Sequence, residues 1–113
     1  MVFACNVSTL SNNSSRGFEI ALDSGTFFGF VVRNDAGELR SYKNSCPHTG
    51  APLNWTPDKF LCLAGDYIQC SLHGARFLLN DGDCVSGPCA GKALVALQVL
   101  EKRGELFIDT ASF

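Results

Sequence analysis

Each of the two histidines of this 113-residue chain follows a cysteine within three residues and precedes a glycine within two. One arm reads Cys46-Pro-His48-Thr-Gly, and the other reads Cys70-Ser-Leu-His73-Gly. Each arm offers one thiolate and one imidazole, which are ligands for zinc and for iron. Two Cys and two His can hold one tetrahedral zinc ion, or a [2Fe–2S] cluster with two Cys on one iron and two His on the other. The spacing therefore predicts a metal centre and leaves both chemistries open.

The context of the two arms favours loops between strands over a zinc finger. A zinc-finger arm usually has two like ligands and leads into a helix, whereas each arm here is mixed. Two such loops can face each other across a cluster. Gly50 and Gly74 allow the backbone to fold tightly, so that amide N–H groups can point at sulfur ligands.

The elements expected to position these arms are short strands separated by turn residues such as Asn34-Asp-Ala-Gly37. Evidence for helices is weak throughout, so the predicted fold class is all-β, a small sandwich or barrel. We expect strands at 3–7, 18–22, 27–33, 38–43, 67–70, 75–79, 94–100 and 105–109. A polar loop is expected at 8–17 and an irregular segment at 52–60.

Composition points to one soluble domain spanning residues 1–113. The chain is 46% hydrophobic and 18% charged, so it can bury a core and is too apolar to be disordered. A net charge of −2 argues against nucleic acid as a partner. No apolar run has the length of a membrane span, and the start of the sequence does not resemble a signal peptide. We therefore expect a cytoplasmic protein with no membrane partner and with reduced or metal-bound cysteines.

With these motifs, the sequence resembles the Rieske iron–sulfur proteins. The two arms carry the likeness, and Ser86-Gly-Pro88 is similar to the family's proline loop, which covers the cluster. Length and strand order are similar to the small Rieske-type ferredoxins of aromatic-ring dioxygenase systems. The resemblance implies an antiparallel β-sandwich with a small cluster-binding subdomain, whose cluster-binding loops lie at about 44–53 and 68–77 and whose proline loop lies at about 86–89.

The resemblance also implies a ligand set for one [2Fe–2S] cluster per chain. Cys46 and Cys70 would bind the inner iron, and His48 and His73 would bind the solvent-facing iron. The residues implied to shield the cluster or to support its ligands are Gly50, Gly74 and Pro88.

Four positions depart from the high-potential respiratory and photosynthetic members of this family. Those proteins have a disulfide between the two loops where this chain has Ala51 and Leu72. They also have a serine and a tyrosine where this chain has Ala75 and Phe77, so two hydroxyl donors are missing. Hydrogen bonds to the sulfurs favour the reduced cluster, so the loss of two donors should lower the reduction potential. We therefore expect a reduction potential toward the lower end of the roughly −150 to +300 mV Rieske range. A value above about +100 mV would contradict this expectation.

The implied function is that of a one-electron carrier between a reductase and a terminal oxygenase or related oxidoreductase. We expect the chain not to be an enzyme, because its two histidines leave none for a two-His-one-carboxylate iron site and it has no G-x-G-x-x-G nucleotide motif. Two alternatives stay open: a small Rieske subunit of a larger reductase, such as a nitrite-reductase-like complex, and a structural zinc-binding domain.

The other four cysteines are expected to have a packing role. They are too few and too scattered for a second metal site, and a disulfide between Cys84 and Cys89 is disfavoured by the reducing compartment. These residues are Cys5, Cys62, Cys84 and Cys89.

Overall fold

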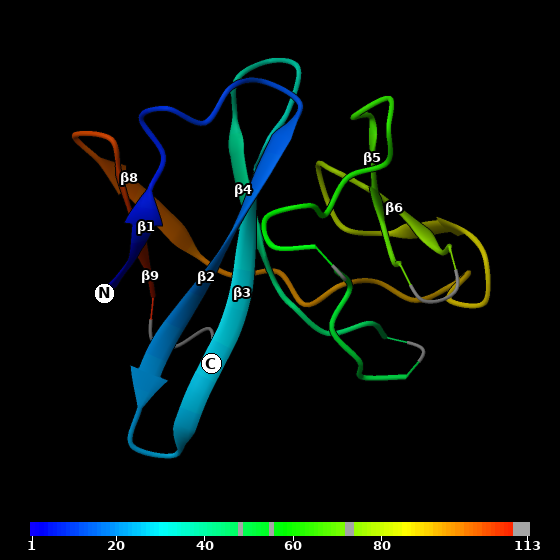
Figure 1. Cartoon of the computed structure of the whole chain (residues 1–113), viewed down its shortest axis with the longest axis horizontal. Coiled ribbons are helices and arrows are strands. Elements are labelled where there is room, and N and C mark those ends of the chain that lie inside the picture. The colour runs from blue at the N-terminus through cyan, green and yellow to red at the C-terminus, as the bar shows by residue number, and fades with distance from the viewer. Residues whose placement is uncertain (48, 55, 72–73, 110–113) are drawn as a thin grey trace.

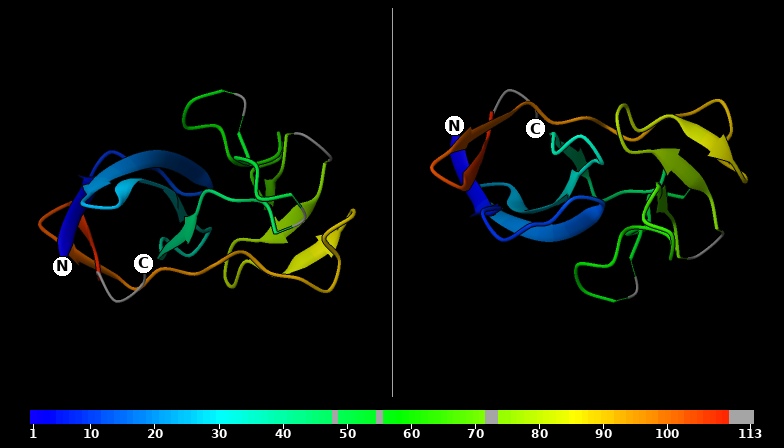
Figure 2. Two further views of the ribbon diagram at one scale, coloured as in Figure 1. Left: turned by 90° about the horizontal axis from the view of Figure 1, so that it is seen from below. Right: turned by 90° about the horizontal axis from the view of Figure 1, so that it is seen from above.

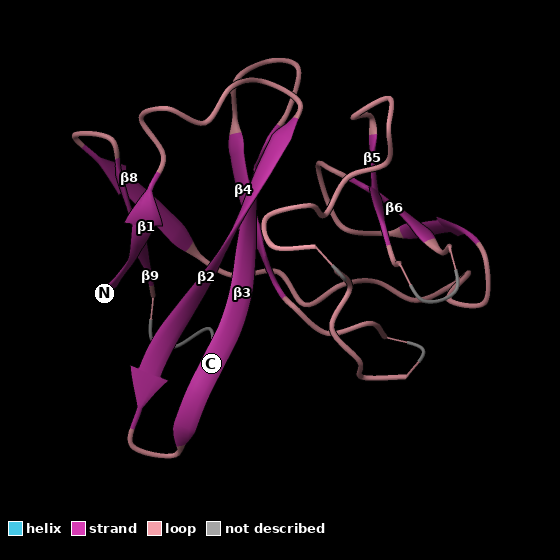
Figure 3. Cartoon of the chain, in the orientation of Figure 1, coloured by secondary structure: helices cyan, strands magenta, loops and turns pink. Residues whose placement is uncertain are grey.

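The computed structural model describes residues 1–47, 49–54, 56–71 and 74–109, and these form antiparallel strands and loops (Figure 1). Within these ranges there are no helices (Figure 3), and hence none long and apolar enough to traverse a bilayer. Three three-stranded sheets have the orders β1-β9-β8, β2-β3-β4 and β5-β6-β7, which confirms the all-β class. The strands are β1 (Val2–Asn6), β2 (Ser14–Leu22), β3 (Gly25–Arg33), β4 (Leu39–Lys43), β5 (Tyr67–Gln69), β6 (Arg76–Leu78), β7 (Cys84–Ser86), β8 (Val99–Lys102) and β9 (Glu105–Ile108).

The segment Gly29–Val32 of strand β3 lies at the centre of the molecule because both of its faces are buried. Its apolar run Phe30-Val31-Val32 is wholly inside. Successive side chains of a strand point to opposite faces. Accordingly, Val31 packs in one core, whereas Phe30 and Val32 pack in a second core. A strand buried on both faces has a continuous apolar sequence rather than an alternating one.

The first core lies between the sheets β1-β9-β8 and β2-β3-β4, which together we call the base. Its buried apolar side chains are Val7, Leu10, Phe18, Ile20, Val31, Leu97, Leu106 and Ile108. Strand β2 shows the pattern expected of a half-buried strand, since exposed Glu19 separates buried Phe18 and Ile20.

The predicted polar loop at 8–17 is wrong at its C-terminal end, because β2 begins at Ser14. Residues 14–17 pair with Phe30–Arg33 of β3, of which Phe30, Val31 and Val32 are buried. The backbone groups of a buried strand need hydrogen-bonding partners, and these polar residues supply them. Tertiary pairing thus overrides the turn-like composition of this segment.

The predicted strand at 94–100 is also largely wrong, because β8 begins only at Val99. Leu94 and Leu97 are the buried residues of the preceding segment, three positions apart rather than alternating. The N–H of Leu94 donates to the carbonyl of Gly82, and the N–H of Leu97 donates to that of Ser41. The segment is therefore an irregular crossing between two regions of the molecule.

The third sheet and its loops form a separate end of the molecule, which we call the tip (residues 44–94). Figure 2 shows this end opposite β1, β8 and β9 in both views. Each of its strands has three residues. The sequence pattern predicts β5 and β6 but misses β7, a strand that is mostly exposed and pairs with β6 across a bulge. The tip packs on the base through the second core, where the rings of Phe60 and Phe30 stack 4.3 Å apart.

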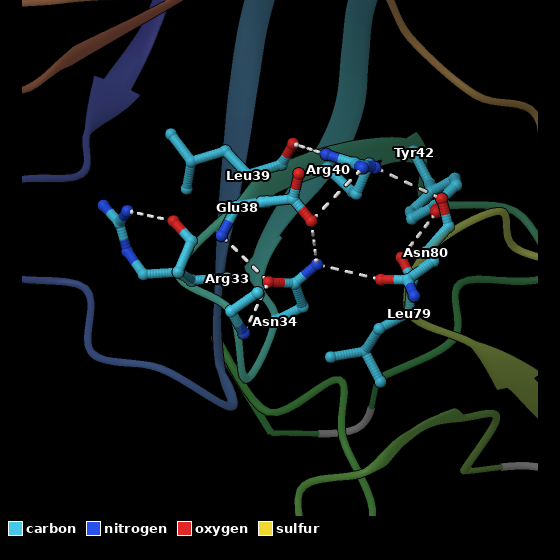
Figure 4. A network of polar contacts seen from close by, with 10 residues as sticks. Arg33, Asn34, Glu38, Leu39, Arg40, Tyr42, Leu79 and Asn80 are labelled. Atoms are coloured by element: carbon cyan, nitrogen blue, oxygen red, sulfur yellow. Dashed lines mark hydrogen bonds and ion pairs between the residues drawn. The ribbon is translucent and has the colours of Figure 1, made fainter.

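A polar network joins the base to the turn after β6 (Figure 4). Asn34 is 4% exposed, and its side-chain amide donates to Asn80 Oδ1 at 2.9 Å and to Glu38 Oε1 at 3.1 Å. Its Oδ1 accepts the N–H groups of Ala36 and Glu38. The hydroxyl of Tyr42 donates to the carbonyl of Leu79 at 2.7 Å. These contacts fix the orientation of the tip on the base.

Candidate metal centre

The two loops that carry the predicted ligands have the same backbone geometry. In the first loop, the N–H of Cys46 donates to the carbonyl of Ala51 at 2.8 Å, and the N–H of Gly50 donates back to the carbonyl of Cys46 at 2.7 Å. In the second loop, Cys70 donates to Ala75 at 2.8 Å, and Gly74 donates back to Cys70 at 2.9 Å. Two segments of different sequence thus present their cysteines in equivalent positions.

A glycine is required at the same place in both loops. Gly50 has φ +78° and Gly74 has φ +70°, a region that side chains with a Cβ rarely adopt. Each glycine N–H reaches the carbonyl of its cysteine because the chain reverses at this point. Both turns therefore favour glycine at this position.

The two loops are joined through Leu53, which is fully buried. Its N–H donates to Asn44 Oδ1 at 2.8 Å, which ties it to the start of the first loop. Its carbonyl accepts the N–H of Ser71 in the second loop at 2.7 Å. The relative position of the two loops is therefore set by two hydrogen bonds of the Leu53 backbone, one to the Asn44 side chain and one to the Ser71 backbone.

Cys46 and Cys70 are both inside this core, with exposed fractions of 1% and 0%. His48 and His73 lie outside the described residues. Among the described residues, no group of three or more His, Cys, Asp or Glu side chains comes together. Two buried thiols from matched loops, each two or three residues from a histidine in sequence, form a donor set that suits a [2Fe–2S] cluster with mixed Cys and His ligands.

The predicted proline loop packs against both ligand loops. Gly87 has φ +91°, and a Cβ at this position would lie 2.8 Å from the Cα of Ala75 in the second loop. Pro88 is exposed, and Cys89 next to it is fully buried. The Sγ of Cys89 lies 3.5 Å from the Sγ of Cys46 in the first loop. The loop Ser86–Cys89 therefore closes one side of the site.

Cys89 is the residue at this site that the sequence interpretation missed, since it was expected only to pack. A usable signal was present, because Cys89 directly follows the Gly87-Pro88 pair of the loop predicted to cover the centre. Its sulfur lies beside that of Cys46, one of the predicted ligands, rather than among apolar side chains alone.

The remaining cysteines lie in other surroundings. Burial raises the pKa of the half-buried Cys5 thiol in β1. The thiol of Cys62 donates to Asp66 Oδ1 at 3.2 Å, and that of Cys84 donates to the carbonyl of Ser86 at 3.2 Å. The described residues include all six cysteines, and no disulfide joins any of them. The disfavoured Cys84–Cys89 disulfide does not form.

Solved structures with this fold include both ferredoxins and an oxygenase. A chain from a complex of reduced oxygenase and oxidized ferredoxin in carbazole 1,9a-dioxygenase is 24% identical, with a TM-score of 0.69, over 96% of this chain and 100% of that one. The Sphingomonas yanoikuyae B1 ferredoxin is 22% identical, with a TM-score of 0.71, over 96% and 97%. The quaternary ammonium Rieske monooxygenase CntA is 23% identical, with a TM-score of 0.74, over 96% of this chain but 31% of that one. No curated protein matches the chain in sequence.

A family model provides the assignment that these structural likenesses alone do not. The model of the Rieske [2Fe–2S] domain matches residues 1–103, which include both ligand loops and the proline loop. A [2Fe–2S] cluster of this type takes up and releases one electron. The chain therefore belongs to the Rieske [2Fe–2S] domain family, whose cofactor is this cluster and whose chemistry is electron transfer.

Proposed function

We propose that the chain is a one-electron carrier whose cluster is held by Cys46 and Cys70 on the inner iron and by His48 and His73 on the outer iron. The observation that carries the proposal is the matched pair of loops, each presenting one buried cysteine through the same two hydrogen bonds. The cluster supplies the redox chemistry, cycling between two states that differ by one electron.

The chain's own residues contribute position and a dry environment. The buried side chains around Cys46 and Cys70 are apolar, and they include Leu53, Phe60, Ile68 and Phe77. An apolar surrounding keeps water from the inner ligands and makes each nearby amide or thiol dipole more effective, since the local dielectric constant is low. Ala75 and Phe77 are fully buried and carry no hydroxyl. This supports a potential toward the lower part of the Rieske range.

We further propose that the electron passes from a reductase to a terminal oxygenase or related oxidoreductase. Both histidines are used as cluster ligands in this account, so none is left for an oxygenase iron site on this chain. The fold match to the carbazole dioxygenase complex, where a ferredoxin meets its oxygenase, supports an oxygenase as acceptor. The absence of disulfides among the six cysteines supports the cytoplasm as the compartment.

A reductive titration tests the carrier role. Anaerobic addition of dithionite should bleach the visible charge-transfer bands with one electron per chain, and cytochrome c should then take that electron back. A colourless protein with one bound zinc ion would contradict the proposal and favour a structural zinc domain.

Affinity capture from the cells of origin tests the partners. We expect recovery of a reductase and an oxygenase or oxidoreductase component, below stoichiometric amounts and weakened by salt, as for a diffusible carrier. A stable one-to-one complex that survives salt would contradict diffusion and support a subunit of a larger reductase.

A further inference from the structure

Two sulfurs from different loops meet at the centre of the tip. Cys46 Sγ and Cys89 Sγ are 3.5 Å apart although the residues are 43 positions apart in the sequence. Both side chains are buried, with exposed fractions of 1% and 0%. The separation is far longer than an S–S bond of about 2.05 Å, and it suits a hydrogen bond between a thiol and a second sulfur.

Cys89 is held at this position by the backbone of its own loop. Its carbonyl accepts the N–H of Lys92 at 2.9 Å, and the carbonyl of Lys92 accepts the N–H of Cys84 in β7. The N–H of Ala90 donates to the carbonyl of Gly87, which itself packs on Ala75. The loop is thus anchored to the third sheet on one side and to the second ligand loop on the other.

The direction of this hydrogen bond follows from the chemistry of the ligand. A cysteine that binds iron is a thiolate and has no proton to donate. If Cys46 is a ligand, only the thiol of Cys89 can supply the proton between the two sulfurs. The contact is then an S–H donor aimed at a ligating sulfur in a water-excluded site.

We propose that Cys89 donates a hydrogen bond to the ligating sulfur of Cys46 and thereby raises the reduction potential of the centre. This proposal rests on the proposed function, specifically on Cys46 as a ligand. Reduction adds negative charge, part of which lies on the ligand sulfurs, so a donor at a sulfur stabilises the reduced form more than the oxidised form. Cys89 is a positioning residue that acts through Cys46.

The hydrogen bond from Cys89 would partly replace hydroxyl donors that this chain lacks. The two hydroxyl donors of high-potential relatives are replaced here by Ala75 and Phe77, both buried. A thiol is a weaker donor than a hydroxyl. Cys89 therefore restores part of the stabilisation of the reduced form, from a third loop, without a serine or tyrosine.

The experiment compares three variants of the holoprotein: Cys89→Ala, Cys89→Ser and the control Cys84→Ala. Cys84 is also a buried cysteine of the tip, but its thiol donates to the carbonyl of Ser86. Visible absorption first establishes that each variant holds the cluster, and redox titration then gives its midpoint potential. If the wild-type protein lacked the absorption bands, that result would contradict the proposed function rather than the role of Cys89.

We expect Cys89→Ala to lower the ratio of reduced to oxidised protein at a fixed potential by about threefold to tenfold, where tenfold corresponds to about 59 mV for one electron. Cys89→Ser keeps a hydrogen-bond donor, so its midpoint potential should be higher than that of Cys89→Ala. Cys84→Ala should have the same midpoint potential as the wild type. Equal midpoints for Cys89→Ala and wild type, or for the two Cys89 variants, would overturn the proposal. Loss of the bands in both Cys89 variants but not in Cys84→Ala would also overturn it, because Cys89 would then be a ligand or a structural requirement.

Discussion

The base and the tip contain the same kind of strand but are stabilised in different ways. In the base, β2 and β3 pair along nine residues each, and the buried apolar cluster contains no cysteine, although half-buried Cys5 packs against it. In the tip, the strands have three residues each, and the buried set includes Cys46, Cys70, Cys84 and Cys89. Sheets of such short strands are marginal by themselves. The tip must therefore obtain stability from its packing on the base, its loop hydrogen bonds and its bound cluster.

The base is therefore a scaffold, whereas the folding of the tip is linked to its cofactor. Binding free energy of a metal group that needs a folded site is also folding free energy. We expect the base to be indifferent to the cluster and the tip to depend on it.

Removal of Cys70, one of the two proposed inner ligands, should affect the two regions unequally. In Cys70→Ser, loss of the cluster should lower hydrogen-exchange protection in β5–β7 by two orders of magnitude or more, about 3 kcal/mol, while β2 and β3 keep theirs. Hydrogen exchange followed by mass spectrometry measures both regions in one sample. The control is Cys5→Ser in β1, which should keep the cluster. Equal loss of protection in base and tip would refute the contrast.

A substitution in the proline loop tests how closely this loop packs within the tip. Gly87→Ala should destabilise the protein by about 3 kcal/mol or more, because the left-handed φ is strained and the new Cβ would meet the backbone of Ala75. Gly91→Ala is the matched control, since Gly91 has φ +88° but nothing within 4 Å of the added Cβ. It should cost about 1 kcal/mol. Urea unfolding gives both values, and similar costs for the two variants would argue against close packing of this loop.

The polar junction between the regions should have a smaller effect. Asn34→Ala removes a buried side chain that donates to Asn80 and Glu38 and accepts from two backbone N–H groups. We expect a cost of about 2 kcal/mol, since four hydrogen bonds of a buried side chain are lost while their partner groups, which belong to exposed residues, regain water. Urea unfolding of Asn34→Ala, Asn80→Ala and the double variant measures the coupling. Additive costs would mean that the two side chains do not act together.

The smallest effect concerns Tyr42, whose hydroxyl donates from the base to Leu79 in the tip. Tyr42→Phe should cost about 1 kcal/mol near neutral pH. Burial, together with Asp81, raises the pKa of Tyr42 to about 12. The neutral phenol therefore contributes stability that is fully present below its unfolded pKa of about 10 and is lost as pH rises toward about 12. Urea unfolding at rising pH should show wild type losing stability faster than Tyr42→Phe in this window, and parallel curves would contradict the assignment.

The sequence predicted the features that depend on local chemistry. The glycine-bearing turns, the β2–β3 hairpin and the loops around Cys46 and Cys70 all have signals within a few residues. The all-β class followed from these turns. The family resemblance was confirmed because its motifs lie in residues that the family model covers.

The features that the sequence did not predict depend on distant partners. Ser14–Gly17 form a strand because β3 needs a neighbour, and β7 forms beside β6 although its own sequence is unremarkable for a strand. The position of Cys89 beside Cys46 arises from contacts of the proline loop with Ala75 and with β7. No single-segment pattern contains that information.

The ligand set is the central claim, and the histidine count allows a direct measurement of it. The chain contains two histidines, so ¹⁵N-histidine labelling marks only His48 and His73. Pulsed electron paramagnetic resonance of the dithionite-reduced protein should show hyperfine coupling to two histidine nitrogens, both changed by the label. Coupling to one such nitrogen or to none would contradict a cluster held by Cys46, His48, Cys70 and His73.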